Sequence, residues 1–205
     1  MKHAFVFKQI PLYRFLDLCL QNAKSENVSI LDCGAGGDMP PLALFKAYGF
    51  NTSGIEIDEQ AIKSAYAFAA SRDLELNIQT GDMTALPFHD ACFDFVYSYN
   101  SIFHMKKIEI EKAVKELKRV LKPGGLMFVN FLSTDDFRCG EGPHLGDNQY
   151  EQMDDEPVIH SYYANDEADQ YFVDMTTLIK EQRVIQRIYE GEPIKQGFID
   201  YILIK

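Results

Sequence analysis

The chain has 205 residues, of which 46% are hydrophobic, and a formal net charge of −11. This length favours one domain spanning 1–205 with small additions, and the apolar share suffices for a full core. The acidic balance argues against partners such as nucleic acids and anionic membranes, because both select proteins with a basic face. It does not identify a substrate, since surface acidity commonly serves solubility.

Four cysteines are widely scattered along the chain, at Cys19, Cys33, Cys92 and Cys139. No C-x-x-C pair suggests a zinc site or a redox dithiol, so no metal is expected. Free thiols favour a reduced, cytoplasmic protein. We find no signal-peptide apolar run at the N-terminus and no stretch of membrane-spanning length. The sequence favours no particular oligomeric state.

Strand and helix patterns alternate over the first two thirds of the chain, after an apolar-basic arm at 1–11. We expect strands at 27–32, 52–57, 76–80, 93–98 and 126–131, and helices at 12–24, 41–48, 58–71 and 107–121. Asp58 should cap the third helix, and Gly49 should end the second. The alternation predicts an α/β fold with a doubly wound, Rossmann-like, mostly parallel sheet.

The character of the sequence changes after Ser133. Residues 133–165 are polar and rich in glycine and proline, which predicts a long functional loop or lid. A short helix is expected at 166–172. Residues 182–190 and 196–204 flank the turn signal Gly191-Glu192-Pro193 and predict an antiparallel hairpin. The predicted single domain therefore divides into an arm and helix (1–27), a cofactor-binding core (28–132), a lid or substrate segment (133–172) and a C-terminal hairpin (173–205).

The stretch from Ser29 to Pro41, SILDCGAGGDMPP, reads as a strand, a tight glycine turn and the start of a helix. Glycines let the backbone approach a ligand closely and adopt dihedral angles closed to other residues. Asp38 is a good N-cap, and prolines suit the first helical turn. The exposed N–H groups at such a helix start favour an anionic ligand group. A turn without any ligand is the alternative.

Three successive predicted strands end in a carboxylate, at Asp32, Glu56 and Asp82. In an open parallel sheet these ends share the edge at which ligands bind. Glu56 suits a ribose diol, Asp82 an exocyclic amine such as that of adenine, and Asp32 an ammonium group. The alternatives are an ordinary turn residue for Asp82 and a surface charge for Glu56. Asp94 is expected only to bond nearby backbone.

Four motifs in order resemble those of class I S-adenosylmethionine-dependent methyltransferases. They are ILDCGAGGD at 30–38, GIEID at 54–58, GDMTALPF with DACFDFVYS at 81–98, and LKRVLKPGGLMFVNF at 117–131. The likeness covers roughly residues 28–132. It implies a seven-stranded sheet with one antiparallel strand, which agrees with the predicted C-terminal hairpin, and S-adenosylmethionine as cofactor.

The resemblance also assigns cofactor contacts to residues of this chain. It implies that the methionine part is lined by Asp32, Gly34, Ala35 and Gly36, with the Ser98 backbone approaching its end. Glu56 would hold the ribose, and Asp82 and Met83 the adenine, with Ile57 packed on the ring. The chain departs from the family at position 38, where a third glycine is common. We interpret Asp38 as a cap of its own helix rather than a cofactor contact.

The expected reaction is methyl transfer to a small-molecule acceptor, which needs alignment of donor and acceptor more than a catalytic triad. The catalytic residues are therefore not assigned. The acceptor-side candidates are Tyr99, Asn100 and His104, which follow strand 93–98, His160 in the polar segment, and Tyr13. A histidine that caps or packs beneath the next helix is the alternative for His104, and core packing is the alternative for Tyr13.

Two other functions remain open on the sequence alone. An NAD-dependent oxidoreductase would use Glu56 for the ribose, but Met39 stands where G-x-G-x-x-G has its last glycine. Asp38 also suits a pyrophosphate poorly. A non-catalytic S-adenosylmethionine-binding protein of the same fold is the other alternative, because fold alone does not decide function.

Overall fold

The computed structural model describes residues 10–25, 27–154, 156–189 and 191–205. The helices are α1 (Ile10–Asn22), α2 (Leu42–Ala47), α3 (Glu59–Ala70), α4 (Lys107–Val120) and the 3-10 helix η1 (Glu167–Phe172). The strands are β1 (Ser29–Cys33), β2 (Asn51–Glu56), β3 (Ile78–Thr80), β4 (Phe93–Ser98), β5 (Leu121–Ser133), β6 (His144–Gly146), β7 (Gln149–Met153), β8 (Pro157–Tyr163), β9 (Thr176–Tyr189) and β10 (Glu192–Ile204).

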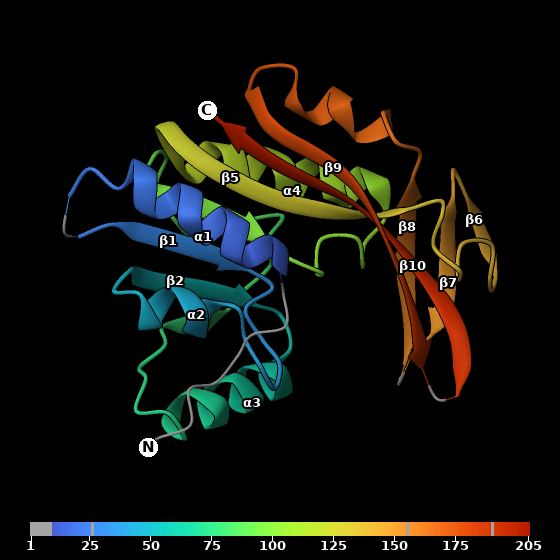
Figure 1. Cartoon of the computed structure of the whole chain (residues 1–205), viewed down its shortest axis with the longest axis horizontal. Helices are drawn as coiled ribbons and strands as arrows, with labels where there is room; N and C mark the ends of the chain where they lie inside the picture. Colours follow the sequence, from blue (N-terminus) through green and yellow to red (C-terminus); the bar gives the residue numbers. More distant parts are fainter. Residues whose placement is uncertain (1–9, 26, 155, 190) are drawn as a thin grey trace.

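The main sheet runs in the spatial order β3-β2-β1-β4-β5-β10-β9 (Figure 1). Its first five strands are parallel, whereas β10 is antiparallel to both β5 and β9. This confirms the predicted mostly parallel, doubly wound sheet with an antiparallel strand near the C-terminus. The order reverses at β1 and β4, which is where ligands bind in open sheets of this kind.

Both faces of the sheet are buried, because neighbouring side chains of a strand point to opposite sides. Ile30 and Phe128 pack with α1, α2 and α3 on one face. Leu31, Met127 and Val129 pack with α4 and η1 on the other. This double cover explains why β4 and the second half of β5 read as nearly unbroken apolar runs.

Helix boundaries mostly follow the local signals. Asp58 accepts a hydrogen bond from the Gln60 amide at 2.7 Å and caps α3, as predicted. Gly49 follows α2 with φ +89°, which also agrees with its predicted role. The predicted arm at 1–11 lies largely outside the described residues. Among those described, no helix combines the length and apolarity needed to cross a membrane.

The predicted loop at 133–165 is wrong in part, because this segment contains three strands. β6, β7 and β8 form an antiparallel unit, and the end of β8 pairs with the end of β5. With these three strands the described residues hold a ten-stranded sheet rather than seven strands. β6 and β7 are largely exposed, so they lack the apolar alternation that marks a strand.

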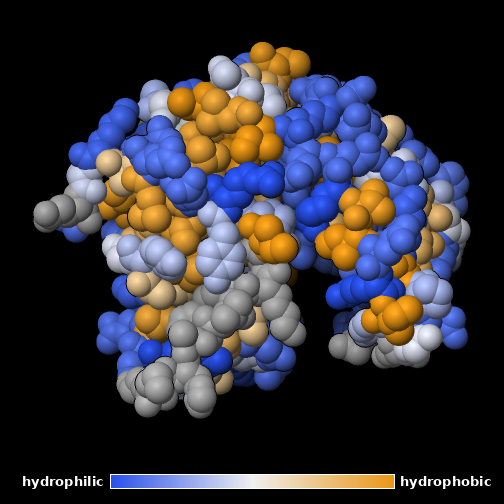
Figure 2. Space-filling model, viewed as in Figure 1, coloured by the Kyte–Doolittle hydropathy of each residue, from blue (hydrophilic) through white to orange (hydrophobic). Residues whose placement is uncertain are grey.

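The C-terminal hairpin is confirmed and longer than predicted, since β9 begins at Thr176. Phe198–Ile204 of β10 pair with β5, whereas 192–197 pair with β9 alone among the described residues. The hairpin therefore projects beyond the main sheet toward β6, β7 and β8 (Figure 1). Figure 2 shows a deep notch between this projecting end and the part of the molecule built on the main sheet.

Candidate functional site

The glycine turn after β1 is fixed by contacts with two neighbouring segments. Gly34 has φ +99°, and its amide donates to the Ile55 carbonyl at 2.8 Å. A Cβ atom on Gly34 would lie 2.2 Å from Ser101 Oγ. Both the backbone angle and the close approach therefore require glycine here.

Glu56 bridges the end of β2 to the same turn. Its Oε2 accepts from the Gly36 amide at 3.0 Å, and its Oε1 accepts from the Ile57 and Asp58 amides at 2.8 and 3.0 Å. A Cβ on Gly36 would lie 2.8 Å from Glu56 Oε2, so this contact also needs glycine. The carboxylate is thus held in one orientation before any ligand arrives.

A cavity of about 320 Å³ opens beside this carboxylate. Its lining residues are Gly34, Ile55, Glu56, Ile57, Gly81, Asp82, Met83, Ser101, His104 and Met105. The volume falls within the usual range for small-molecule sites, about 300–1,000 Å³. Ile57 is 72% exposed at this cavity, so an apolar side chain is available to a flat ring.

Asp82 serves a turn and lines the cavity at the same time. It follows β3, and its Oδ1 accepts from the Thr84 amide at 2.8 Å. This is the ordinary turn contact that the sequence left open as an alternative. Only Oδ1 takes part in that turn contact, and Met83 lies next to Asp82 in the lining.

Four residues predicted for the cofactor do not line the cavity. They are Asp32, Ala35, Gly36 and Ser98. Asp32, Ala35 and Ser98 are buried, and the Ser98 hydroxyl has no hydrogen-bond partner among the described residues. Gly36 is connected to the cavity by the hydrogen bond that its amide donates to Glu56.

Asp32 lies in the core beneath the glycine turn. Tyr97 Oη donates to Asp32 Oδ2 at 2.8 Å. Burial raises the pKa of the Asp32 carboxyl to about 8, against the opposing effect of the Tyr97 hydrogen bond, and the charge of Glu56 raises it further. The carboxyl is therefore neutral over much of the physiological range unless a cation comes near.

The predicted cap at Asp38 is wrong. The N-cap of α2 is Pro41, which makes no side-chain capping bond, and Asp38 is exposed. The two prolines at 40 and 41 delay the helix, so that Asp38 falls outside its first turn.

Asn100 supports the wall of the cavity rather than lining it. It has φ +55° after β4, and its amide N–H donates to Asn130 Oδ1 at 2.8 Å. Asn130 Nδ2 donates in return to Asn100 Oδ1 at 2.7 Å. This reciprocal pair ties the loop after β4 to β5.

Two tyrosines predicted as acceptor-side candidates pack into the core. Tyr99 lies against Phe128 with ring centroids 5.8 Å apart, and burial raises the pKa of its phenol. Tyr13 is half-buried against the same cluster. Neither lines the cavity.

His104 and His160, both predicted candidates, are brought together. Their ring centroids are 4.6 Å apart, edge to face. The Ser161 amide and hydroxyl, in β8, donate to the Phe103 and Met105 carbonyls at 3.0 and 2.6 Å and fix this contact. Burial lowers the pKa of His104 to about 4 and lowers the pKa of His160, so both imidazoles are neutral near pH 7.

Sequence reasoning missed four lining residues, namely Ile55, Gly81, Ser101 and Met105. Gly81 and Ile55 adjoin predicted site residues, so extending each motif by one position would have included them. No sequence motif marks Ser101, because its place at the site depends on its contact with Gly34, which follows a different strand.

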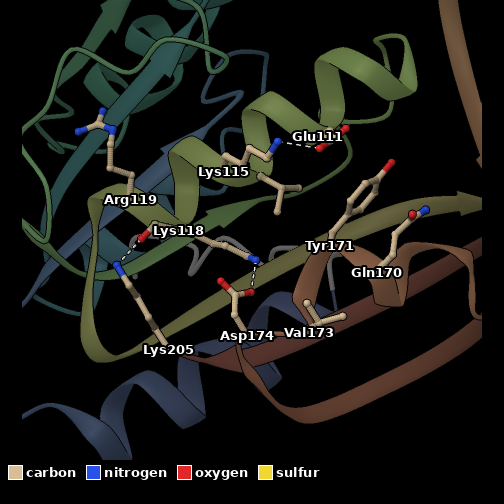
Figure 3. A pocket seen from close by; sticks show the side chains of 10 residues that line it. Glu111, Lys115, Lys118, Arg119, Gln170, Tyr171, Val173, Asp174 and Lys205 are labelled. Atoms are coloured by element: carbon tan, nitrogen blue, oxygen red, sulfur yellow. Dashed lines mark hydrogen bonds and ion pairs between the residues drawn. The ribbon is translucent and has the colours of Figure 1, made fainter.

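A larger cavity of about 540 Å³ lies between α4 and the segment that includes Tyr171–Asp174 (Figure 3). Its cations are already engaged: Lys118 pairs with Asp174 and Lys115 with Glu111, and Lys205 donates to the Lys118 and Leu121 carbonyls. It contains none of the predicted site residues. The smaller cavity at the strand ends is therefore the candidate site.

Comparison with known sequences adds an independent finding. Residues 31–129 match the family model described as a methyltransferase domain. Over 105 residues the chain is 42% identical to 2-methyl-6-phytyl-1,4-hydroquinone methyltransferase from Synechocystis sp., which covers 49% of this chain and 31% of that protein. Over 103 residues it is 33% identical to norajmaline N-methyltransferase from Rauvolfia serpentina, covering 49% and 34%. The chain thus matches about a third of the length of these relatives.

Solved structures share the fold over nearly the whole chain. A SAM-dependent methyltransferase from Methanosarcina mazei superposes with a TM-score of 0.72 at 23% identity, covering 91% of this chain and 96% of that one. The [4+2]-cyclase SpnF superposes with a TM-score of 0.67 at 18% identity, covering 94% and 80%. The same fold therefore occurs in proteins named for different reactions.

Proposed function

We propose that the chain, whose residues 31–129 match the methyltransferase domain model, is a class I S-adenosylmethionine-dependent methyltransferase that transfers a methyl group from S-adenosylmethionine to a small-molecule acceptor. The observation that carries this proposal is the cavity at the strand ends, where Glu56, Ile57 and Asp82 come together. Those three side chains supply a ribose acceptor, an apolar ring contact and an amine acceptor.

In this proposal the adenosine half occupies the outer part of the cavity. A carboxylate has about four acceptor positions, and three backbone amides already use three of those on Glu56. One ribose hydroxyl can take the remaining position, and a second must displace an amide. Asp82 and the Met83 amide would bind adenine, with Ile57 against its face.

The methionine half would lie toward the glycine turn. Gly34 would line it with backbone, and Ala35, Gly36 and the Ser98 backbone would lie behind that surface. Asp32 would act from below, because a nearby ammonium favours its ionised form. These roles follow the family resemblance and are supported by the position of the turn beside the cavity.

Methyl transfer disperses the sulfonium charge, so positioning of donor and acceptor is the main requirement and can supply about 7–11 kcal/mol. Of the acceptor-side candidates Tyr99, His104 and His160, His104 lines the cavity. We therefore assign acceptor contact to His104. The net charge of −11 supports a small molecule over a nucleic acid, as do relatives named for a hydroquinone and an alkaloid.

Calorimetric titration with S-adenosylhomocysteine and with NAD tests the cofactor. We expect one S-adenosylhomocysteine per chain and no NAD binding. NAD binding without S-adenosylhomocysteine binding would contradict the proposal and favour an oxidoreductase.

A second experiment tests the reaction. Transfer of a labelled methyl group is measured across a panel of phenols, hydroquinones and amines. Cofactor binding with no transfer to any acceptor would instead favour a non-catalytic binding protein, or a reaction other than methyl transfer, as the likeness to a cyclase allows.

A further inference from the structure

Three side chains from separate parts of the chain meet beside the candidate cavity. His104 lies in the turn after β4, Asp154 follows β7, and His160 lies in β8. Each offers one ligand atom, and these atoms lie within 4.8 Å of one another. From this convergence we propose that His104, Asp154 and His160 bind a divalent transition-metal ion such as Zn²⁺.

The two ring nitrogens of His160 have different surroundings. Its side chain is buried, yet Nδ1 has no hydrogen-bond partner among the described residues. Its Nε2 lies 3.6 Å from Asp154 Oδ2, which is too long for a hydrogen bond. An ion bound between Nε2 and Asp154 Oδ2 would fill the space between these two atoms, whereas Nδ1 lies on the other side of the ring.

The donor set suits a transition metal. Two imidazoles and one carboxylate form the three-ligand arrangement of catalytic metal sites, which leaves positions for a substrate. Bonds of about 2.0–2.2 Å put the ligand atoms of one ion about 3–4 Å apart, so a modest contraction closes the site. Asp154 is exposed, so its side chain can rotate to provide it.

Arg138 and Asp136 set the charge around the cluster. The Arg138 guanidinium donates to Asp154 Oδ1 at 2.6 Å and to the Met153 carbonyl at 3.2 Å, so it orients the carboxylate and leaves Oδ2 toward His160. Asp136 Oδ1 accepts from the Arg138 amide at 3.0 Å, so a second carboxylate lies beside this arginine. Such outer contacts commonly hold metal ligands in place.

The location suggests what the ion does, and this step rests on the proposed methyl transfer. His104 lines the cavity, so an ion bound to it lies at the cavity's edge. A divalent ion lowers the pKa of a bound hydroxyl group. The acceptor would then be an alcohol or phenol that loses its proton to solvent and binds the ion as its alkoxide or phenolate. That oxygen would bond to the methyl carbon as the bond from this carbon to the sulfonium sulfur breaks, and S-adenosylhomocysteine would leave.

Metal binding is tested on the full chain stripped of metal, by calorimetry with Zn²⁺ and by visible absorption with Co²⁺. We expect one ion per chain, bound at least tenfold more weakly by Asp154→Asn and by His160→Asn. His89→Asn is the matched control, because His89 is exposed and outside the cluster. Asp154→Asn alters an exposed side chain, so it keeps the test valid should the buried His160 variant unfold.

The outcomes separate the two proposals. No Zn²⁺ binding, or equal binding by all variants, would overturn the metal site, whatever the cofactor titration gives. Zn²⁺ binding without S-adenosylhomocysteine binding would leave the site and remove methyl transfer. If both bind, Asp154→Asn should lower kcat for phenol acceptors by tenfold or more. Equal rates with both proteins would overturn the role in activating the acceptor.

Discussion

The carboxylate of Glu56 at the end of β2 accepts the amide of Gly36 in the turn after β1, at 3.0 Å. Its other oxygen accepts the amides of Ile57 and Asp58. One side chain therefore joins the glycine turn to the start of α3 and also faces the cavity. The acidic residue that sequence reasoning assigned to ligand recognition has an architectural role as well.

Replacement of Glu56 by alanine should affect both roles. We expect S-adenosylhomocysteine affinity to fall by about 1.5–3 kcal/mol, the range for a charged hydrogen bond. The free energy of unfolding should also fall, because three amides lose their acceptor. Calorimetry and urea denaturation measure the two effects. Glu59→Ala, at an exposed position in α3, is the control. Unchanged affinity in a folded Glu56→Ala protein would refute the ribose role.

Gly34→Ala should be more destabilising than Gly49→Ala. Both glycines have positive φ, +99° and +89°, so both variants bear a backbone cost of about 1–2 kcal/mol. Only at Gly34 does the added Cβ meet another atom, Ser101 Oγ at 2.2 Å. Urea denaturation should show this difference, and Ser101→Gly in the Gly34→Ala background should remove most of it. Equal losses in the two single variants would contradict the packing argument.

Asp32 should make the folded state less stable as the pH rises. Its pKa is about 8 in the folded protein against 3.8 as a reference, so between these values the folded state binds more protons than the unfolded state. Stability therefore falls from about pH 4 to pH 8. Asp32→Asn should remove this slope and gain on the order of a few kcal/mol at pH 8.

Urea denaturation across this pH range measures the slope attributed to Asp32. Asp17→Asn, at an exposed position of α1, is the control and should keep the wild-type slope. A wild-type slope in Asp32→Asn as well would show that another group causes the pH dependence.

The buried ion pair of the hairpin gives a further prediction. Asp200 accepts from Arg183 Nε at 2.9 Å and from Nη2 at 3.2 Å. Asp200→Ala leaves the guanidinium without its carboxylate and should cost about 3–5 kcal/mol. The double change Arg183→Met with Asp200→Leu should cost less than this single change. A double variant that is less stable than Asp200→Ala would contradict this account of the pair.

The core strands could be predicted because burial on both faces leaves a plain apolar signal, as in β4, whose predicted and observed bounds agree. The β6–β8 unit could not, since β6 and β7 bury little apolar surface and the buried half of β8 includes the polar His160 and Ser161. One sequence signal was available, the pair Asp147-Asn148 between β6 and β7, because such residues favour tight hairpin turns. Both residues adopt the positive φ that these turns require. The predicted cap at Asp38 was wrong because the preference of aspartate for N-cap positions does not determine which residue begins the helix.

The candidate site likewise has one part that the sequence predicts and one part that it does not. Gly34, Glu56 and Asp82 follow strands, so their position at one sheet edge follows from topology. The proximity of His104 to His160 depends on β8 docking against the loop after β4, through Ser161. No spacing rule encodes that contact. Cysteine spacing, the only metal signal considered in the sequence, therefore did not predict the cluster that His104 and His160 form with Asp154.

The reciprocal amide pair between Asn100 and Asn130 has a consequence for ligand entry. It anchors the loop that carries Ser101 and His104 to the central strand β5, so the backbone of this wall is held in place before a ligand binds. A ligand arriving there meets a preshaped surface and not a flap that must fold over it. The shape of this wall before binding should therefore determine which ligands fit against it.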